Sequence, residues 1–140
     1  MGTRVVVFPQ HGKEFFTLMG EFFAFRDYAQ EMGGWQFYTK KGSVWFVALD
    51  DGGCVQGFCS IIQERTHIYF DNMYVLRECR GRGISRLLFD ERLRYARGMG
   101  QEIRVITDNP IQLRRYRESG FLECGKRGRY TKFKLERNER

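Results

Sequence analysis

The stretch that decides the fold is residues 73–85, MYVLRECRGRGIS, where an apolar strand meets a glycine-rich turn and then a helix. Such a turn presents backbone N–H groups that have no intrahelical partner. The helix dipole adds about half a positive charge at the same end. Together they predict a seat for phosphate oxygens, with Arg80 and Arg82 beside it. The alternative is an ordinary strand–helix turn whose charges serve solubility.

Two familiar phosphate-binding motifs do not match this turn. A Walker loop has Lys-Ser or Lys-Thr after its last glycine, whereas Gly83 is followed by Ile84 and Ser85. The dinucleotide fingerprint needs a third glycine and a place after the first strand, but this turn lies in mid-chain. The turn therefore belongs to neither class.

Composition indicates a single domain, residues 1–140, because 140 residues with 42% hydrophobic content can bury a proper core. The sequence has no apolar run long enough for a membrane helix, and its N-terminal apolar run is too short for a signal peptide. Its four cysteines lack C-x-x-C spacing and its two histidines are isolated. We therefore expect no metal site, and reduced thiols in a cytoplasmic protein.

Charge is unevenly distributed along the chain. Residues 1–76 carry a net charge of −2 and residues 77–140 one of +9. The basic part begins near the glycine-rich turn, which favours a polyanionic partner: a phosphorylated cofactor, a nucleic acid or both. Most of the arginines of the following helix are expected simply to solvate it: Arg86, Arg92, Arg94 and Arg97.

Apolar periodicity and turn residues predict the order of elements. Strands are expected at 4–8, 43–50, 54–63, 66–75 and 103–107, helices at 12–32, 83–97 and 110–118, and a terminal hairpin over 121–135. Residues 35–39 form either a short strand or an aromatic loop. This order predicts an α/β fold with a mixed sheet and helices on both faces.

The helix predicted at 83–97 has an irregular apolar pattern. One face carries Ile84, Leu87, Leu88 and Tyr95 together with Glu91, and the far side carries Phe89, Leu93 and Ala96. A second apolar face indicates either a homodimer interface or packing beneath the aromatic first helix.

Three motifs resemble those of the GNAT superfamily of acyl-CoA-dependent N-acetyltransferases. The first is Arg-x-x-Gly-x-Ser over residues 80–85, where the family usually has Gly or Ala in place of Ser85. The others are Asn109 followed by Tyr116, and then Gly120-Phe121. With the preceding meander, the resemblance covers about residues 43–136. Arg77 stands where many members have proline.

The resemblance implies a GNAT-like sheet, splayed in the middle, and acetyl-CoA as co-substrate. The backbone of Met73, Tyr74 and Val75 would pair with the pantetheine arm like a missing strand. Backbone amides of the turn would hold the pyrophosphate, from Arg80, Gly81, Arg82, Gly83, Ile84 and Ser85. Asn109 would contact the cofactor arm, and Tyr116 would lie near the thioester sulfur.

Acyl transfer from a thioester needs an acid for the leaving thiolate. A phenol gives a proton to a thiolate uphill by about 1.5 pKa units, roughly 2 kcal/mol, which a positioned hydrogen bond can cover. Tyr116 is the candidate general acid, and the alternative is a ring that merely packs on the sheet. An N–H group near Val75 could donate to the oxyanion.

The candidate general base is Asp71. Simple alternation places it on the face of Met73 and Val75, unless a β-bulge breaks that parity. The alternative is a strand-end carboxylate paired with an arginine. His67, Tyr69 and Glu91 are weaker candidates.

The favoured function is an N-acetyltransferase that moves an acetyl group from acetyl-CoA directly onto an acceptor amine. The basic half disfavours polycationic acceptors and favours an amine carried on nucleic acid, such as aminoacyl-tRNA or a DNA base. One alternative is a non-catalytic nucleic-acid-binding module that contacts phosphates and stacks on bases. Another is a GNAT fold that binds CoA only for structure or sensing. No membrane partner is expected.

Overall fold

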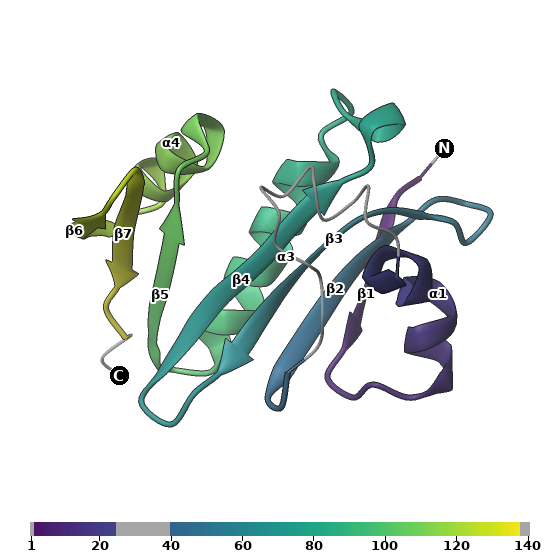
Figure 1. The fold of residues 1–140 in the computed structure, drawn as a ribbon, viewed down its shortest axis with the longest axis horizontal. Helices are drawn as coiled ribbons and strands as arrows, with labels where there is room; N and C mark the ends of the chain where they lie inside the picture. The colour runs from purple at the N-terminus through teal and green to yellow at the C-terminus, as the bar shows by residue number, and fades with distance from the viewer. Residues whose placement is uncertain (1, 25–39, 138–140) are drawn as a thin grey trace.

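The sheet of this protein consists of two halves that meet through one short pairing (Figure 1). The computed structural model describes residues 2–24 and 40–137, which form a seven-stranded sheet with the order β1-β2-β3-β4-β5-β7-β6. One half is antiparallel and contains β1 (Arg4–Phe8), β2 (Ser43–Leu49), β3 (Val55–Gln63) and β4 (His67–Val75). The other half contains β5 (Glu102–Thr107), β7 (Tyr130–Leu135) and β6 (Leu122–Arg127).

The two halves are joined by a parallel pairing of β4 with β5. This pairing covers only His67, Ile68 and Tyr69 on the β4 side. Beyond Tyr69 the strands diverge towards their C-terminal ends, at the top of Figure 1. The prediction of a mixed sheet, splayed in the middle, is confirmed.

Helices cover both faces of the sheet, as predicted. α1 (Lys13–Ala24) lies on one face, and α3 (Ile84–Gly98) and α4 (Pro110–Glu118) lie on the other. A 3-10 turn, η1 (Arg77–Cys79), leads from β4 towards α3. The predicted continuation of the first helix to residue 32 and the element at 35–39 lie outside the described residues. No helix within 2–24 or 40–137 is long and apolar enough to cross a bilayer.

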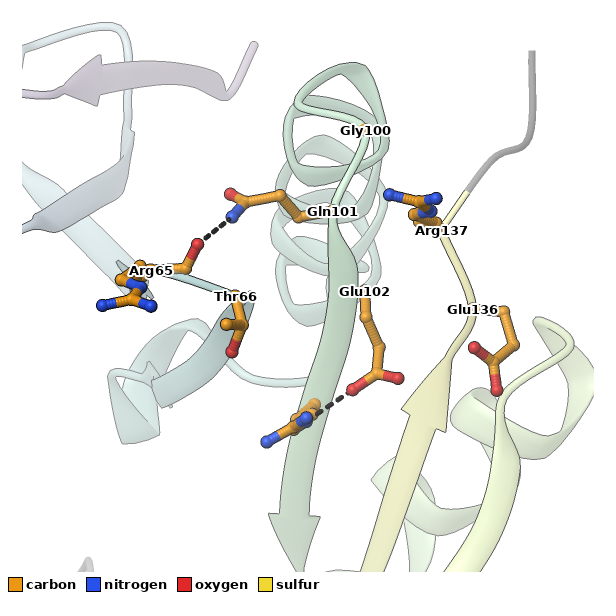
Figure 2. Close-up of a pocket in the computed structure, with 8 residues that line it drawn as sticks. Arg65, Thr66, Gly100, Gln101, Glu102, Glu136 and Arg137 are labelled. Atoms are coloured by element: carbon orange, nitrogen blue, oxygen red, sulfur yellow. Dashed lines mark hydrogen bonds and ion pairs between the residues drawn. The ribbon is translucent and has the colours of Figure 1, made fainter.

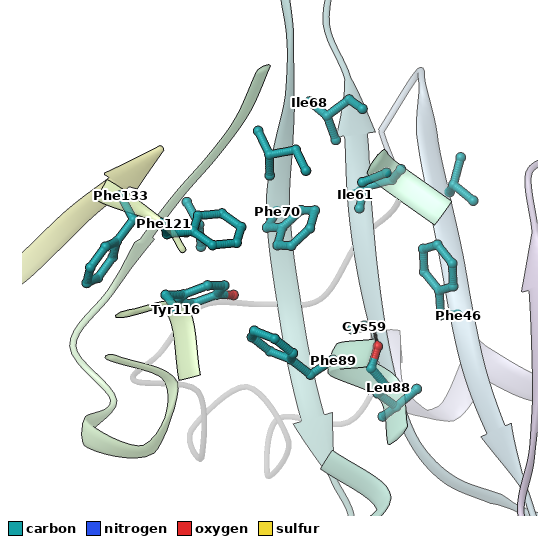
Figure 3. Close-up of a cluster of buried hydrophobic side chains, with 14 of the residues drawn as sticks. Phe46, Cys59, Ile61, Ile68, Phe70, Leu88, Phe89, Tyr116, Phe121 and Phe133 are labelled. Atoms are coloured by element: carbon teal, nitrogen blue, oxygen red, sulfur yellow. Dashed lines mark hydrogen bonds between the residues drawn. The ribbon is translucent and has the colours of Figure 1, made fainter. Parts of the chain in front are cut away.

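Alternating strand residues divide the core between the two faces. The cluster beneath α1 includes Phe15, Phe22, Trp45, Phe58 and Tyr74. The larger cluster beneath α3 and α4 contains Phe46, Ile61, Phe70, Leu88, Phe89, Tyr116, Phe121 and Phe133 (Figure 3). This second cluster is continuous from β2 to β7, so it holds the two halves of the sheet together even where β4 and β5 diverge.

The expectation of two apolar faces on α3 is wrong. Its buried residues are Ile84, Leu88, Phe89, Arg92 and Ala96, which together form one face against the sheet. α1 lies across the sheet from α3, so α3 does not pack beneath it. Arg92 was expected to solvate the helix, but it is buried in the middle of this face.

Gly57 allows β3 and β4 to approach closely beside the splayed region. A Cβ atom at this position would lie 2.8 Å from the Tyr74 carbonyl oxygen and 3.2 Å from Val75 Cα. We therefore expect Gly57→Ala to lower the free energy of unfolding by about 1–3 kcal/mol, as overpacking does. Urea denaturation measures this, with Gly98→Ala as the control, since a Cβ at Gly98 has no atom within 4 Å. An equal, small effect of both substitutions would contradict the expectation.

Candidate active site between the splayed strands

A β-bulge marks the place where β4 leaves β5. Cys59 pairs with Met73 and Ile61 with Phe70, so two residues of β4 lie opposite Ser60. These two residues are Asp71 and Asn72. A bulge bends its strand and re-aims its side chains, which separates the end of β4 from β5.

The end of β4 presents backbone groups to the gap. Leu76 N–H donates to Gln56 O on β3 at 2.9 Å. The backbone N–H and C=O groups of successive residues point to opposite sides of a strand. Those of Tyr74 therefore point towards β3, and those of Met73 and Val75 point away from it. The Val75 carbonyl accepts a hydrogen bond from Arg80 Nε at 2.9 Å, which ties the glycine-rich turn to the strand. The Val75 N–H group is thus left facing the gap.

The glycine-rich turn forms an uncapped helix start. Gly81 and Gly83 have φ angles of 80° and 81°, in the left-handed region that glycine adopts without strain. Gly83 is the N-cap of α3 and offers no side chain to its first N–H groups. Such uncapped N–H groups, beside the end of β4, are a candidate anion seat. Ser85 at the edge of the seat accepts a hydrogen bond from Arg115 on α4, which links α3 to α4.

Asn109 begins α4 immediately after β5. Its Oδ1 accepts hydrogen bonds from Ile111 N–H at 2.9 Å and Gln112 N–H at 3.2 Å, as an N-cap does. Pro110 follows in the first turn. With the carboxamide oxygen engaged in capping, contact with a cofactor arm would use Asn109 Nδ2.

Tyr116 on α4 is 2% exposed and is surrounded by aromatic rings. Ring-centroid distances are 4.9 Å to Phe121, 5.2 Å to Phe89 and 5.7 Å to Phe133. The ring extends from α4 towards β4, with its hydroxyl end nearest that strand (Figure 3). The Tyr116 ring therefore does pack on the sheet, as the alternative to a general acid supposed. This packing still leaves the Tyr116 hydroxyl directed at β4.

Arg92 holds the Tyr116 hydroxyl. Its Nη2 donates to Tyr116 Oη at 2.9 Å. Burial raises the pKa of Tyr116, and the positive charge of Arg92 acts in the opposite direction. Arg92 was not among the predicted site residues, although its spacing contained a signal: residues 84, 88, 92 and 96 repeat every four positions along one helix face.

Asp71 does not share the face of Met73 and Val75, because the bulge changes the parity. Met73 and Val75 pack with the cluster beneath α3. Asp71 lies 4.0 Å from Lys40 Nζ and accepts a hydrogen bond from Asn72, which also reaches Ser60 Oγ. Its ion pair is thus with a lysine rather than an arginine. Burial raises the pKa of Asp71, while Lys40 and Arg92 lower it.

The structure brings four ionisable groups together across the gap. Tyr69 interacts electrostatically with Asp71 and Tyr116, and Asp71 and Tyr116 both interact with Arg92. Burial raises the pKa of Tyr69. The weaker candidates lie elsewhere: His67 contacts Thr66 at the other end of β4, and Glu91 is paired with Arg94. The geometry therefore concentrates ionisable groups where β4 and β5 separate.

A separate cavity of about 660 Å³ lies at the opposite ends of β4 and β5. Figure 2 shows it lined by side chains of both charges, with Gln101 bonded to the backbone of Arg65. Glu102 in this cavity pairs with Arg104. It contains none of the residues of the gap or the glycine-rich turn. Its size alone does not make it the site.

Comparison with known proteins agrees with this geometry. A model of the Acetyltransferase (GNAT) family matches residues 12–121. A GNAT-family acetyltransferase of Staphylococcus aureus Mu50 has a TM-score of 0.68 at 15% identity, over 96% of this chain and 100% of its own. The PaiA N-acetyltransferase of Thermoplasma acidophilum, solved with coenzyme A, has a TM-score of 0.68 at 13% identity, over 96% and 99%.

An IAA acetyltransferase of Bacillus cereus has the same fold, with a TM-score of 0.66 at 17% identity over 96% of this chain and 99% of its own. A search of curated proteins finds no match. At these identities the structural likeness shows the fold, and the family model, which spans most of the chain, shows the family. The chain therefore belongs to the GNAT acetyltransferase family and is an acyl-CoA-dependent N-acyltransferase.

Proposed function

We propose that this enzyme transfers an acetyl group from acetyl-CoA directly to an acceptor amine in the gap between β4 and β5. The observation that carries the proposal is the meeting in one place of an uncapped helix start, the end of β4 that no longer pairs with β5, and a tyrosine hydroxyl held by Arg92. The residues fit the co-substrate: the amides at Gly83, Ile84 and Ser85 bind the pyrophosphate, and the outer edge of Met73 and Val75 pairs with the pantetheine arm.

The gap residues supply the remaining chemistry. The Val75 N–H group donates to the carbonyl oxygen as negative charge develops on it. The amine nitrogen bonds to the acetyl carbon, the carbon–sulfur bond breaks, and Tyr116 gives its proton to the sulfur. Asp71 removes the proton that the amine loses. We assign no nucleophilic role to Cys59, because burial raises its pKa to about 11 and disfavours the thiolate.

Thermal unfolding with ligands tests the proposal. Acetyl-CoA should raise the melting temperature by several degrees at concentrations well above its dissociation constant, and AMP should raise it much less. CoA-thiol release with a set of amines should then show transfer. Equal stabilisation by any polyanion, without CoA release, would favour a basic nucleic-acid-binding module instead.

Asp71→Asn should lower turnover by about 100-fold and change its pH dependence. A general base must be ionised, so the rate of the natural enzyme falls as pH drops through the pKa of Asp71, which burial raises above 3.8. The variant should lose this acidic limb. Asp90→Asn is the control, because Asp90 is an exposed carboxylate on α3 paired with Arg86. An acidic limb that survives in Asp71→Asn would assign the base elsewhere.

A groove on the outer face of β5, β6 and β7 favours an acceptor that carries negative charge. Its volume is about 490 Å³, and Tyr69 is among the residues that line it. Four cations line it against one carboxylate, Glu102: Arg104, Arg127, Lys132 and Lys134. Within the described chain, neither Arg127 nor Lys132 has an ion pair. An acceptor amine on a molecule that carries phosphate or carboxylate groups, such as aminoacyl-tRNA, complements the positive charge of this groove.

Matched acceptors test the charge of the substrate. Glycine should be preferred over glycinamide, and O-phosphoethanolamine over ethanolamine, by about 10-fold or more in kcat/KM. Lys132→Glu should abolish the preference, and Lys126→Glu, outside the groove, should retain it. A preference for spermidine over every anionic amine would contradict an anionic acceptor.

A further inference from the structure

Among the residues that the structure describes, Arg92 is a buried cation without a carboxylate partner. Its side chain is 1% exposed, and its Nε has no hydrogen-bond partner among the residues that the structure describes. None of the carboxylates in those residues forms an ion pair with it. Burial of an unpaired charge is strongly unfavourable. A side chain that served packing alone would be apolar, so the charge itself needs an explanation.

We propose that Arg92 is a positioning residue for the transfer of a proton from Tyr116 to the leaving thiolate, an inference that rests on the proposed function. A hydroxyl has one hydrogen and two lone pairs, whereas a guanidinium can only donate. Arg92 Nη2 therefore occupies a lone pair of Tyr116 Oη, at 2.9 Å, and the hydroxyl hydrogen points elsewhere. Within 2–24 and 40–137 that hydrogen has no acceptor. It is available to a group that enters the gap.

The same guanidinium fixes where the hydroxyl lies relative to β4. Arg92 Nη1 donates to Ser60 O at 3.3 Å and to Asn72 O at 3.1 Å, the carbonyls on the two sides of the bulge. Its plane lies over the Phe70 ring, 4.3 Å from the centroid. Because a guanidinium is planar and rigid, one side chain sets the distance from Tyr116 Oη to the splayed strand.

Charge is the second contribution of Arg92. When the carbon–sulfur bond breaks, sulfur takes the bonding electron pair and then the Tyr116 proton. Tyr116 is left as a phenolate and Asp71 holds the proton lost by the amine nitrogen; release of that proton and reprotonation of Tyr116 restore the starting state. The adjacent guanidinium stabilises that phenolate. Without Arg92, the effect of burial, which makes Tyr116 a weaker acid, would lose its largest opposing contribution.

Four charged or titratable groups face Tyr116 from the surrounding elements. They are Cys59 on β3, Tyr69 on β4, Arg92 on α3 and Arg115 on α4 itself. Arg92 is the member of this set that donates a hydrogen bond to the hydroxyl. Removal of Arg92 should therefore raise the pKa of Tyr116. Tyr116 must hold its proton to act as an acid, so the alkaline limb of the pH–rate profile should move to higher pH.

The first test measures the ionisation of Tyr116 from the absorbance of tyrosinate as pH rises. The signal of Tyr116 is the titration curve of each protein minus the curve of the same protein carrying Tyr116→Phe. Arg92→Met should ionise at a pH at least about one unit higher than the natural chain. Arg92→Lys, which keeps the charge, should lie between the two. Arg94→Met is the matched control on the same helix, because Arg94 is exposed and pairs with Glu91. It should leave the ionisation of Tyr116 unchanged.

The second test is a double-mutant cycle with acetyl-CoA and hydroxylamine, a small amine that is neutral at pH 7. Arg92→Met should lower kcat by about 10–100-fold, with the KM for acetyl-CoA changed by less than about threefold. In the Tyr116→Phe background the same substitution should have little further effect, because both act on one proton.

Two results would overturn the role of Arg92. One is a Tyr116 ionisation that does not move in Arg92→Met or Arg92→Lys. The other is a double variant in which the fold-losses of kcat from Arg92→Met and from Tyr116→Phe multiply, as they would for two independent residues. Should Arg92→Met fail to fold, Arg92→Lys decides both points. Failure of the proposed function differs, since it would appear as a natural enzyme that acetylates nothing and binds no acetyl-CoA.

Discussion

Tyr116→Phe should lower kcat by about 100- to 10,000-fold, the range that general acid catalysis contributes. The ring stays in its aromatic cluster in this variant, so only the hydroxyl and its bond to Arg92 are lost. The proposed pyrophosphate seat lies on another helix, so we expect the affinity for acetyl-CoA to change by less than about twofold. Steady-state CoA release and calorimetry measure the two quantities separately.

The control for this substitution is Tyr130→Phe. Tyr130 lies on β7, and its hydroxyl bonds to the exposed Arg129 rather than to a buried cation. Turnover of this variant should equal that of the natural enzyme. Normal turnover in Tyr116→Phe would remove Tyr116 from the proposed reaction.

Gly83→Asp should weaken acetyl-CoA binding by about 100-fold or more. Gly83 has a φ angle of 81°, so any side chain strains the turn. The introduced carboxylate would also stand at the first amides of α3 and repel the pyrophosphate. The dissociation constant for acetyl-CoA, measured by calorimetry, reports both effects.

The matched control is Gly100→Asp at the other end of α3. Gly100 has a φ angle of 74°, and a Cβ atom there would meet nothing within 4 Å, as at Gly83. The backbone strain is thus similar, while the pyrophosphate seat is untouched. Equal losses of acetyl-CoA affinity in the two variants would mean that the effect comes from general destabilisation.

Much of the fold could be predicted because its signals are local. The left-handed glycines of the turn, the proline and asparagine that begin α4, and the alternating strands each act over a few residues, and the structure contains these elements close to the predicted positions. The splay of β4 from β5 followed from the family resemblance rather than from the residues themselves.

The electrostatics of the site could not be predicted in the same way. Arg92 was expected to face solvent because an arginine on a helix usually does, and its burial depends on carbonyls of β3 and β4 more than 19 residues away. The face of the sheet on which Asp71 lies depends on a bulge opposite Ser60 of β3. No residue type within β4 predicts that bulge. Tertiary contacts, not propensities, decide both.

The structure of the enzyme with bound CoA tests the central claim most directly. We expect the diphosphate oxygens about 3 Å from the backbone nitrogens of Gly83, Ile84 and Ser85, and the thiol in the gap beside the Tyr116 hydroxyl. A diphosphate bound in the cavity lined by Arg65 and Arg137, or a thiol directed away from Tyr116, would contradict the account.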